Sequence, residues 1–249
     1  MTAREGPRPD PGLQDAAASP GDGSDDLALV SALEAAWTRR RSMRGFLAEP
    51  IPRLQLEHLF AAAQRAPSWC NIQPWRVVLT EPPVTGELAA AMQAAARATA
   101  PHAEVPFPVD YPPPYKERRV ACGAALYRAM GVARNDMAGR YDAFLRNYAF
   151  FDAPHVAIVA CDRRLGPYAY LDVGVWLGYL LTAAAALGID TCPLASVAAY
   201  PEPLRERLPI AQSDVILFGL ALGHADASVA ANQCHTDRDP VSANVAFVR

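Results

Sequence analysis

The sequence is poor in the residues that build metal centres and disulfide frameworks. Its 249 residues include 5 cysteines and 5 histidines, and the cysteines are odd in number and widely scattered. No Cys-x-x-Cys pair or Cys/His pattern has the spacing of a zinc or iron–sulfur site. We therefore expect no metal and no disulfide framework, and we expect a cytoplasmic protein with reduced thiols. The cysteines are Cys70, Cys122, Cys161, Cys192 and Cys234.

The sequence also lacks the two common glycine-rich loops that bind phosphate. No Gly-x-Gly-x-x-Gly follows a predicted strand, and there is no Walker loop. A nucleotide cofactor would therefore need side chains to hold its phosphate, and arginine is the obvious candidate. The formal net charge of −3 provides no global basic field, which argues against nucleic acid and membranes as partners.

Long hydrophobic runs are scarce, although 51% of the residues are hydrophobic. Residues 1–26 are rich in small, polar and proline residues without an apolar run, which excludes a signal peptide and predicts a disordered leader. Residues 27–249 are expected to form a single domain. The most apolar segment, residues 170–187, is marginal for spanning a bilayer and contains Asp172. We expect a helix buried in the core or in a subunit interface.

The residue pattern predicts more helices than strands. Because the strands do not alternate regularly with helices, an α+β fold is favoured over a doubly wound α/β sheet. We expect helices over residues 27–39, 52–65, 87–98, 118–132, 137–148, 170–187 and 203–208, strands over 75–80, 156–161 and 215–222, and a loop over 191–196.

Residues 101–114 combine many prolines with aromatic residues. This proline density excludes a regular helix or strand. A plain surface connector and a lid on the substrate side are both compatible with this composition.

A basic cluster made of Arg40, Arg41 and Arg44, together with Ser42, falls at the predicted end of the first helix. Guanidinium groups suit a phosphate or a ring carbonyl, because they donate forked hydrogen bonds. Such a cluster is also typical of a solvated helix face, so it leaves both interpretations open on its own.

A polar loop lies between Pro67 and Pro74 and contains Ser68, Asn71 and Gln73. Amide side chains both donate and accept hydrogen bonds, which matches the edge of a pyrimidine-like ring. The alternative is an ordinary loop whose side chains satisfy one another.

Cys70 in the same loop raises a separate hypothesis, a cysteine hydrolase. A thiol nucleophile needs a base within reach and a lowered pKa. None of the histidines lies in a recognisable partner motif. We therefore assign no catalytic side chain and keep the hydrolase as an alternative.

In their order and spacing, the two segments resemble the flavin-dependent nitroreductase family. The chain contains complete matches to Arg-Arg-Ser-x-Arg-x-Phe at residues 40–46 and to Ala-Pro-Ser-x-x-Asn-x-Gln-Pro-Trp at residues 66–75. Asp172-Val173-Gly174 and Arg238 agree with the family in the second half. The likeness runs from about Val30 to the C-terminus, and residues 146–154 look closest to the branch with nitrobenzoate-type reductases.

The resemblance implies a central, mostly antiparallel sheet flanked by helices, in an intertwined homodimer that binds FMN at the subunit interface. Arg238 would join Arg40 on the phosphate, and Arg44 would approach the N1/O2 edge of the ring. Asn71 and Gln73 would order the loop or the ring edge. The other implied cofactor contacts are Arg41 and Ser42, then Pro67, Ser68 and Trp69 of the partner subunit, and the backbone of Pro193, Leu194, Ala195 and Ser196 near N5.

Two departures from the family pattern affect this site. Thr236 stands where many members have a second basic residue, which shifts phosphate binding towards Arg40. Ala195 and Ser196 replace the acidic or glycine residues that are common in the N5 loop, which would alter the pocket above the ring.

The implied activity is a ping-pong reaction in which NAD(P)H reduces FMN and a small aromatic acceptor, a nitroaromatic or quinone-like compound, reoxidises it. Tyr111, Tyr115, Phe150 and Phe151 are candidates for the substrate side. The same scaffold could serve a dehalogenase, a natural-product oxidase or a flavin-binding protein without reductase turnover.

Overall fold

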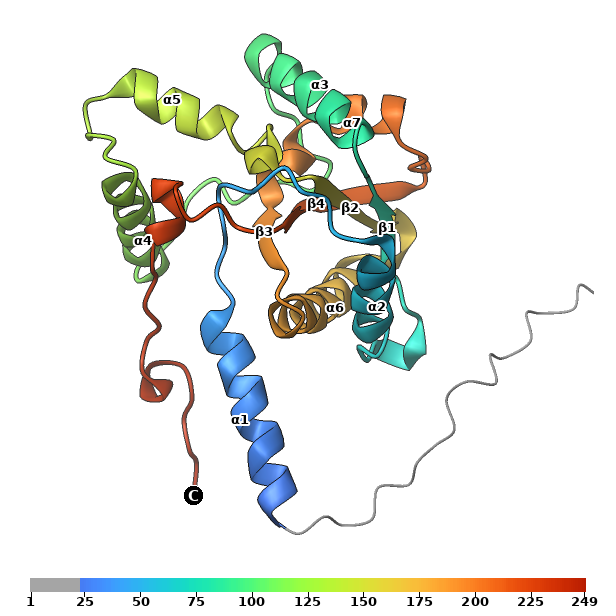
Figure 1. Ribbon diagram of the computed structural model, residues 1–249, viewed down its shortest axis with the longest axis vertical. Coiled ribbons are helices and arrows are strands. Elements are labelled where there is room, and N and C mark those ends of the chain that lie inside the picture. The colour runs from blue at the N-terminus through green and yellow to red at the C-terminus, as the bar shows by residue number, and fades with distance from the viewer. Residues whose placement is uncertain (1–22) are drawn as a thin grey trace, which may run out of the picture.

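The computed structural model describes residues 23–249, so most of the predicted leader, residues 1–26, lies outside the described residues. Helices and a small antiparallel sheet together confirm the α+β fold class (Figure 1). The helices are α1 (Gly23–Arg39), α2 (Arg53–Ala63), α3 (Val84–Ala98), α4 (Tyr115–Ala129), α5 (Met137–Leu145), α6 (Pro167–Ala186) and α7 (Pro201–Arg207). The strands are β1 (Arg76–Leu79), β2 (His155–Asp162), β3 (Asp190–Leu194) and β4 (Asp214–Gly223).

The sheet has the strand order β1-β2-β4-β3, and every neighbouring pair is antiparallel. β2 and β4 occupy the centre, and every residue of β2 is buried. Strands buried on both faces read as continuous apolar runs, which is why residues 156–161 and 215–222 were recognisable from the sequence.

Helices cover both faces of this sheet. Because successive side chains of a strand point to opposite faces, Ile158 of β2 packs with Met92 of α3 and Leu204 of α7. Its neighbour Val159 belongs to the cluster that contains Trp176 of α6 and residues of α2. Figure 1 shows α3 and α7 on one side of the sheet and α2 and α6 on the other.

The helix expected over residues 170–187 is α6. It ends in a Schellman-type turn, in which Ile189 N donates to Ala184 O (2.8 Å) and Gly188 adopts φ +77°. Among the described residues it is the one helix long and apolar enough to cross a membrane by length and composition, a test that core helices also pass. Only one face of α6 is buried in the protomer, since Leu171 and Tyr179 are 63% and 45% exposed.

Helix α1 extends away from the body of the molecule (Figure 1). Of its described side chains only Ala36 is buried, while Leu29, Val30 and Trp37 are exposed. Trp37 Nε1 donates to Thr182 Oγ1 of α6 (3.2 Å), so the C-terminal end of α1 lies against α6. The apolar face that the sequence predicts for this helix is present, but the protomer does not cover it.

The expectation of a loop over residues 191–196 is wrong. Thr191 to Leu194 belong to β3, and a 3₁₀ turn over Ala195–Ala199 follows. Pro193 suggests a break in the sequence, but β3 is an edge strand, where a residue without an N–H group is tolerated.

Residues 101–114 contain no helix or strand, as predicted. Their first part is fixed by Glu104, whose carboxylate accepts hydrogen bonds from Arg163 Nη2 (2.8 Å), Arg205 Nη2 (2.7 Å) and Ile216 N (3.1 Å). Burial opposes ionisation of Glu104, but these hydrogen bonds outweigh it and lower its pKa. Val109, further along, is fully exposed.

Candidate active site

The arginine cluster lies on an irregular segment that comes after α1 in the sequence and runs across one end of the sheet. Helix α1 ends at Arg39, and Ser42 then forms a parallel bridge with Thr191 at the start of β3. Met43 N donates to Thr191 O (3.0 Å), and Leu47 N donates to His224 O (2.8 Å) just after β4. Backbone hydrogen bonds to β3 and to the residue that follows β4 therefore fix the position from which the arginine side chains extend.

Asn232 clamps the middle of this segment. Its Oδ1 accepts a hydrogen bond from Arg44 N (2.6 Å), and its Nδ2 donates to Gly45 O (2.9 Å) and Asp226 O (2.8 Å). The residue is 4% exposed. Gly45 is required here because a Cβ atom would lie 2.5 Å from the Val229 side chain. The clamp fixes the backbone at Arg44.

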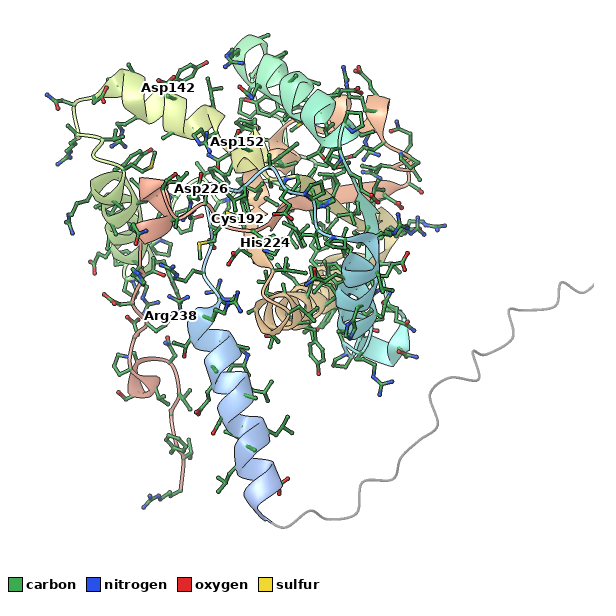
Figure 2. The ribbon with its side chains drawn as sticks, viewed as in Figure 1. Asp142, Asp152, Cys192, His224, Asp226 and Arg238 are labelled. Carbon is green, nitrogen blue, oxygen red and sulfur yellow. The ribbon has the colours of Figure 1, made fainter. Side chains whose placement is uncertain are left out.

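The structure brings Arg40, Arg41, Ser42, Arg44 and Arg238 together around a cavity of about 620 Å³, which we call the cationic cavity. Figure 2 shows Arg238 beside the C-terminal end of α1. Among residues 23–249, none of these arginines forms an ion pair with a carboxylate. Uncompensated guanidinium groups around one cavity are suited to a phosphate.

Two residues of the C-terminal tail order these arginines. Arg238 Nη1 donates to Thr236 Oγ1 (3.1 Å), and Arg41 Nη1 donates to His235 Nε2 (2.9 Å). Since a guanidinium can only donate, the ring nitrogen of His235 is the acceptor. Thr236, which replaces a basic residue of the family pattern, therefore supports Arg238 and lines the cavity beside it.

Strand β3 leads from the arginine segment to residues 193–196. Cys192 is buried here, and burial raises its pKa to about 11 despite the opposing effect of Arg44, so its thiol is protonated at neutral pH. Ala195 is exposed at the end of the strand. The Oγ of Ser196 is buried without a hydrogen-bond partner among the residues that the structure describes.

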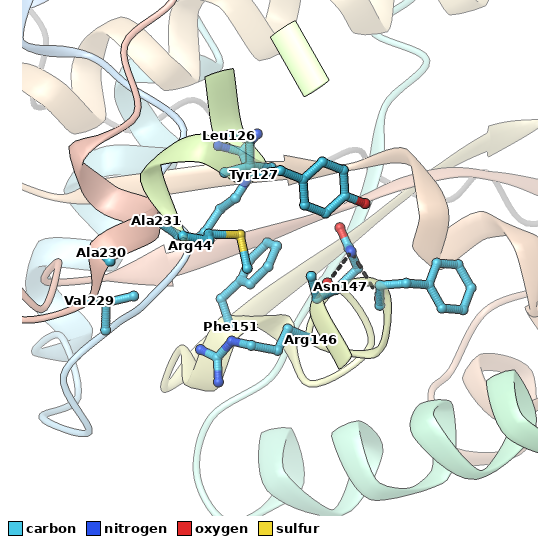
Figure 3. A pocket seen from close by; sticks show the side chains of 12 residues that line it. Arg44, Leu126, Tyr127, Arg146, Asn147, Phe151, Val229, Ala230 and Ala231 are labelled. Atoms are coloured by element: carbon cyan, nitrogen blue, oxygen red, sulfur yellow. Dashed lines mark hydrogen bonds between the residues drawn. The ribbon is translucent and has the colours of Figure 1, made fainter. Parts of the chain in front are cut away.

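A second cavity of about 310 Å³ adjoins the first and shares Arg44 and Leu126 with it. We call it the aromatic cavity, because Tyr127, Phe144 and Phe151 contribute to its lining, together with Arg146 and Asn147. Figure 3 shows these side chains arranged around it.

One wall of the aromatic cavity is a strained turn. Phe150, Phe151 and Asp152 have φ values of +51°, +56° and +65°, a left-handed conformation that is unfavourable for bulky residues. Phe46 N donates to Phe151 O (3.1 Å), which joins the turn to the arginine segment. Backbone strain of this kind persists where the surrounding contacts enforce it, and it is frequent at functional sites.

The polar loop is strained as well, and two of its side chains form hydrogen bonds with the loop's own backbone. Cys70, Asn71 and Gln73 have φ values of +51°, +54° and +46°. Gln73 N donates to Ser68 Oγ (2.9 Å), and Gln73 Nε2 donates to Asn71 O (3.1 Å). The ordinary-loop alternative thus describes the contacts within the protomer. Trp69 is 60% exposed.

The loop and the arginine cluster lie at opposite ends of α6. Trp69 N donates to Asp172 Oδ1 (3.1 Å) in the first turns of this helix, whereas Trp37, which lines the cationic cavity, is bonded to Thr182. Thr182 follows Asp172 by ten positions, a separation of about 15 Å along the helix at ~1.5 Å per residue. The two segments of one protomer therefore do not face the same cavity.

Of the four residues expected on the substrate side, Phe151 lines the aromatic cavity. Phe150 is 0% exposed in the core, so its side chain cannot reach a ligand in this conformation. Tyr111 and Tyr115 lie under the guanidinium groups of Arg119 (5.3 Å) and Arg118 (5.6 Å) and line neither cavity. Among the described residues, Cys70 forms no hydrogen bond with a histidine.

Sequence reasoning did not identify several residues that shape the site. Asn232 and His235 come from the polar tail, where no motif distinguishes them, and their roles depend on long-range contacts with the arginine segment. In the sequence, Arg146 and Asn147 stand out only through their similarity to one family branch. Phe144 and Leu126 lie on α5 and α4, and no pattern in these helices indicates the cavity that they line.

The fold and the two adjoining cavities define a protein that can hold an anionic ligand with an aromatic part at the end of an antiparallel sheet. The chain belongs to the nitroreductase family. The family model described as "Nitroreductase family" matches residues 37–224, which confirms the resemblance seen in the sequence.

Individual relatives agree with this assignment. The chain is 33% identical over 227 residues to a 4-nitrobenzoate reductase of Nocardioides sp. (strain LMS-CY), covering 89% of this chain and 92% of the relative. It is 33% identical to a chloronitrobenzene nitroreductase of Comamonas testosteroni, covering 84% and 93%. Among solved structures, the FMN-dependent nitroreductase NfnB from Mycobacterium smegmatis in complex with NADPH has a TM-score of 0.86 at 28% identity, covering 89% of this chain and 100% of that one.

Proposed function

We propose that the protein is an FMN-dependent NAD(P)H oxidoreductase that reduces nitroaromatic or quinone-like compounds. The observation that carries this proposal is the junction of the cationic and aromatic cavities at Arg44. FMN combines a phosphate with a flat ring. The cationic cavity offers guanidinium groups for the phosphate, and the aromatic cavity offers an aromatic lining for the acceptor that would stack on the ring. The relatives support the choice of reaction.

The residues fit the cofactor at its phosphate end. Arg40, Arg41 and Arg238 would hold the phosphate, because their guanidinium groups face one cavity without carboxylate partners among the described residues. Thr236 would orient Arg238 through its hydroxyl group. Ser42 and Arg44 would contact the cofactor further along, and the backbone of residues 193–196 would lie on the N5 side.

We further propose that the active unit is a homodimer that completes each site. The apolar faces of α1 and α6 are exposed in the protomer, which predicts a large contact surface. Pro67, Ser68, Trp69, Asn71 and Gln73 cannot reach the cationic cavity of their own chain, because they lie at the other end of α6. A two-fold axis across α6 would bring this loop to the cavity of the partner.

Held by these residues, FMN would supply hydride transfer between NAD(P)H and an electron-poor acceptor. Arg44 would stabilise negative charge at the N1/O2 edge of the ring, and its backbone is preorganised by Asn232. Phe151 and its neighbours would exclude water from the acceptor. No side chain of this chain needs to act as a proton donor, since water can supply protons.

The test is anaerobic mixing of the purified protein with NADH or NADPH while the flavin absorbance is followed. The proposal predicts a bound FMN spectrum, bleaching by a nicotinamide, and recovery of the colour on addition of a nitroarene or a quinone. A flavin that binds but stays oxidised would identify a flavin-binding protein without turnover. A reduced flavin that only halophenols reoxidise would favour the dehalogenase alternative, and a protein that takes up no FMN would contradict the whole proposal.

We propose a cytoplasmic location for this enzyme. The five cysteines are all unpaired, which suits a reducing compartment. NAD(P)H is also available in the cytoplasm. Fractionation of cells that express the full chain tests this directly.

A further inference from the structure

The aromatic cavity contains positive charge without an acidic residue in its lining. Arg44 and Arg146 both border it, and the other lining residues are apolar or neutral. Arg44 is committed to the cofactor in the proposed function, whereas Arg146 comes from the other side of the strained turn and has no such role. A cavity of this kind favours an aromatic ligand that also carries a negative charge.

We propose that the enzyme prefers nitroaromatic substrates with a carboxylate or another anionic substituent, and that Arg146 recognises this group. This inference rests on the proposed function, because it concerns the acceptor of the same site. The relatives do not decide the question: the two reported at 33% identity are named for an anionic and for a neutral nitroarene.

Arg146 is held in place by its backbone. It follows α5 directly, and its carbonyl oxygen accepts a hydrogen bond from Phe151 N (3.1 Å). Phe151 is in turn bonded to Phe46 of the arginine segment (3.1 Å). The backbone of Arg146 is therefore anchored to the same framework as that of Arg44, so the residue that would bind the acceptor and the residue that would contact the cofactor belong to one hydrogen-bonded unit.

The side chain of Arg146 retains hydrogen-bonding capacity for a ligand. Its Nη2 pairs with Asp152 Oδ2 at 3.0 Å, and the two side chains are 37% and 62% exposed. Exposed ion pairs are weak. A guanidinium has five N–H donors, so the pair with Asp152 leaves donors that a substrate carboxylate could engage in a forked arrangement. Asp152 itself does not line the cavity.

The test compares 4-nitrobenzoate with its neutral counterpart 4-nitrobenzamide on the FMN-loaded enzyme. We expect kcat/KM to be about tenfold higher for the carboxylate, which corresponds to about 1.4 kcal/mol. R146Q should remove this preference by lowering kcat/KM for the carboxylate far more than for the amide. Added salt should reduce the preference of the unmodified enzyme for 4-nitrobenzoate, because salt screens the attraction between charges.

Two further variants separate local recognition from general charge. R134Q removes the same charge from the exposed connection between α4 and α5, outside both cavity linings, and should keep the preference. D152N frees Arg146 from its partner and should keep or increase it. Unreactive benzoate should inhibit the unmodified enzyme more strongly than benzamide, and R146Q should abolish this difference.

Equal kcat/KM for the two substrates, or a preference that survives in R146Q, would overturn the inference while leaving the proposed function intact. An enzyme that reduces neither compound although NAD(P)H bleaches its flavin would contradict the nitroreductase activity itself. These two failures are distinguishable because flavin reduction is observed independently of the acceptor.

Discussion

Replacing Leu171 with glutamate should dissociate the dimer and release FMN. Leu171 is 63% exposed in the protomer and lies on the uncovered face of α6. Full burial of a leucine stabilises by about 1.5–3 kcal/mol, so covering the exposed part contributes about 1–2 kcal/mol per copy. A two-fold interface contains this residue twice, and burying each unpaired carboxylate costs several kcal/mol more. A total above about 5 kcal/mol weakens association by more than about a thousandfold.

The assay is light scattering on a size-exclusion column with simultaneous detection of flavin absorbance. The matched control is L54E, which places the same charge on α2 at a residue that is 79% exposed, and it should stay dimeric and yellow. L171E should elute as a colourless monomer with a helical circular-dichroism spectrum. A folded L171E monomer that still binds FMN tightly would refute the argument that the partner's loop completes the site, and an undisturbed L171E dimer would refute the proposed interface.

Three other perturbations test individual contacts. N232A removes the clamp on Arg44 and Gly45, and each buried group left unsatisfied costs about 1–3 kcal/mol, so fluorescence titration should show FMN affinity reduced about tenfold or more. E104Q keeps the shape of a side chain that is 18% exposed but removes its charge beside Arg205. If the loss of this charge lowers the free energy of unfolding by about 2 kcal/mol, the melting temperature should fall by about 4–8 °C. Because folding lowers the pKa of Glu104, the ionised carboxylate stabilises the protein at pH values above its pKa in the unfolded chain, and this stabilisation is lost as the pH falls through its pKa in the folded protein. Melting temperatures measured at decreasing pH should show this loss in the unmodified protein and a smaller loss in E104Q. C70S should retain full reductase activity, and a complete loss would show that the Cys70 thiol is needed for that reaction.

The sequence allowed three of the four strands and most helices to be predicted because their signals are local. The central strands contain continuous apolar runs, and α6 ends just before Gly188. Strand β3 was missed because its membership in the sheet depends on pairing with β4, which is distant in the sequence. The presence of Pro193 then favoured a loop. Edge strands are defined by such long-range contacts more than by their own residues.

The candidate site was predictable to the extent that it consists of motifs. The arginines were recognisable, and the fold brings Arg40 and Arg238 to one cavity. Asn232 was not recognisable, since nothing in its local sequence reveals that it will meet the backbone at Arg44. The substrate-side prediction suffered from the opposite problem: Phe150 and Phe151 are adjacent, chemically identical and both buried, at 0% and 4% exposure, yet of the two only Phe151 lines the aromatic cavity.

The split arrangement of the site has a thermodynamic consequence. If FMN is held by the arginines of one protomer and the loop of the other, it binds the dimer and not the monomer. Binding and association are then linked reciprocally: the cofactor strengthens the dimer by the same factor by which dimerisation strengthens cofactor binding. The exposed Trp69 and the strained backbone of residues 70–73 fit this view, because a loop that serves the partner need not be covered in its own chain. The cofactor-free protein should therefore dissociate at higher concentration than the FMN-loaded protein, which sedimentation of both forms can measure.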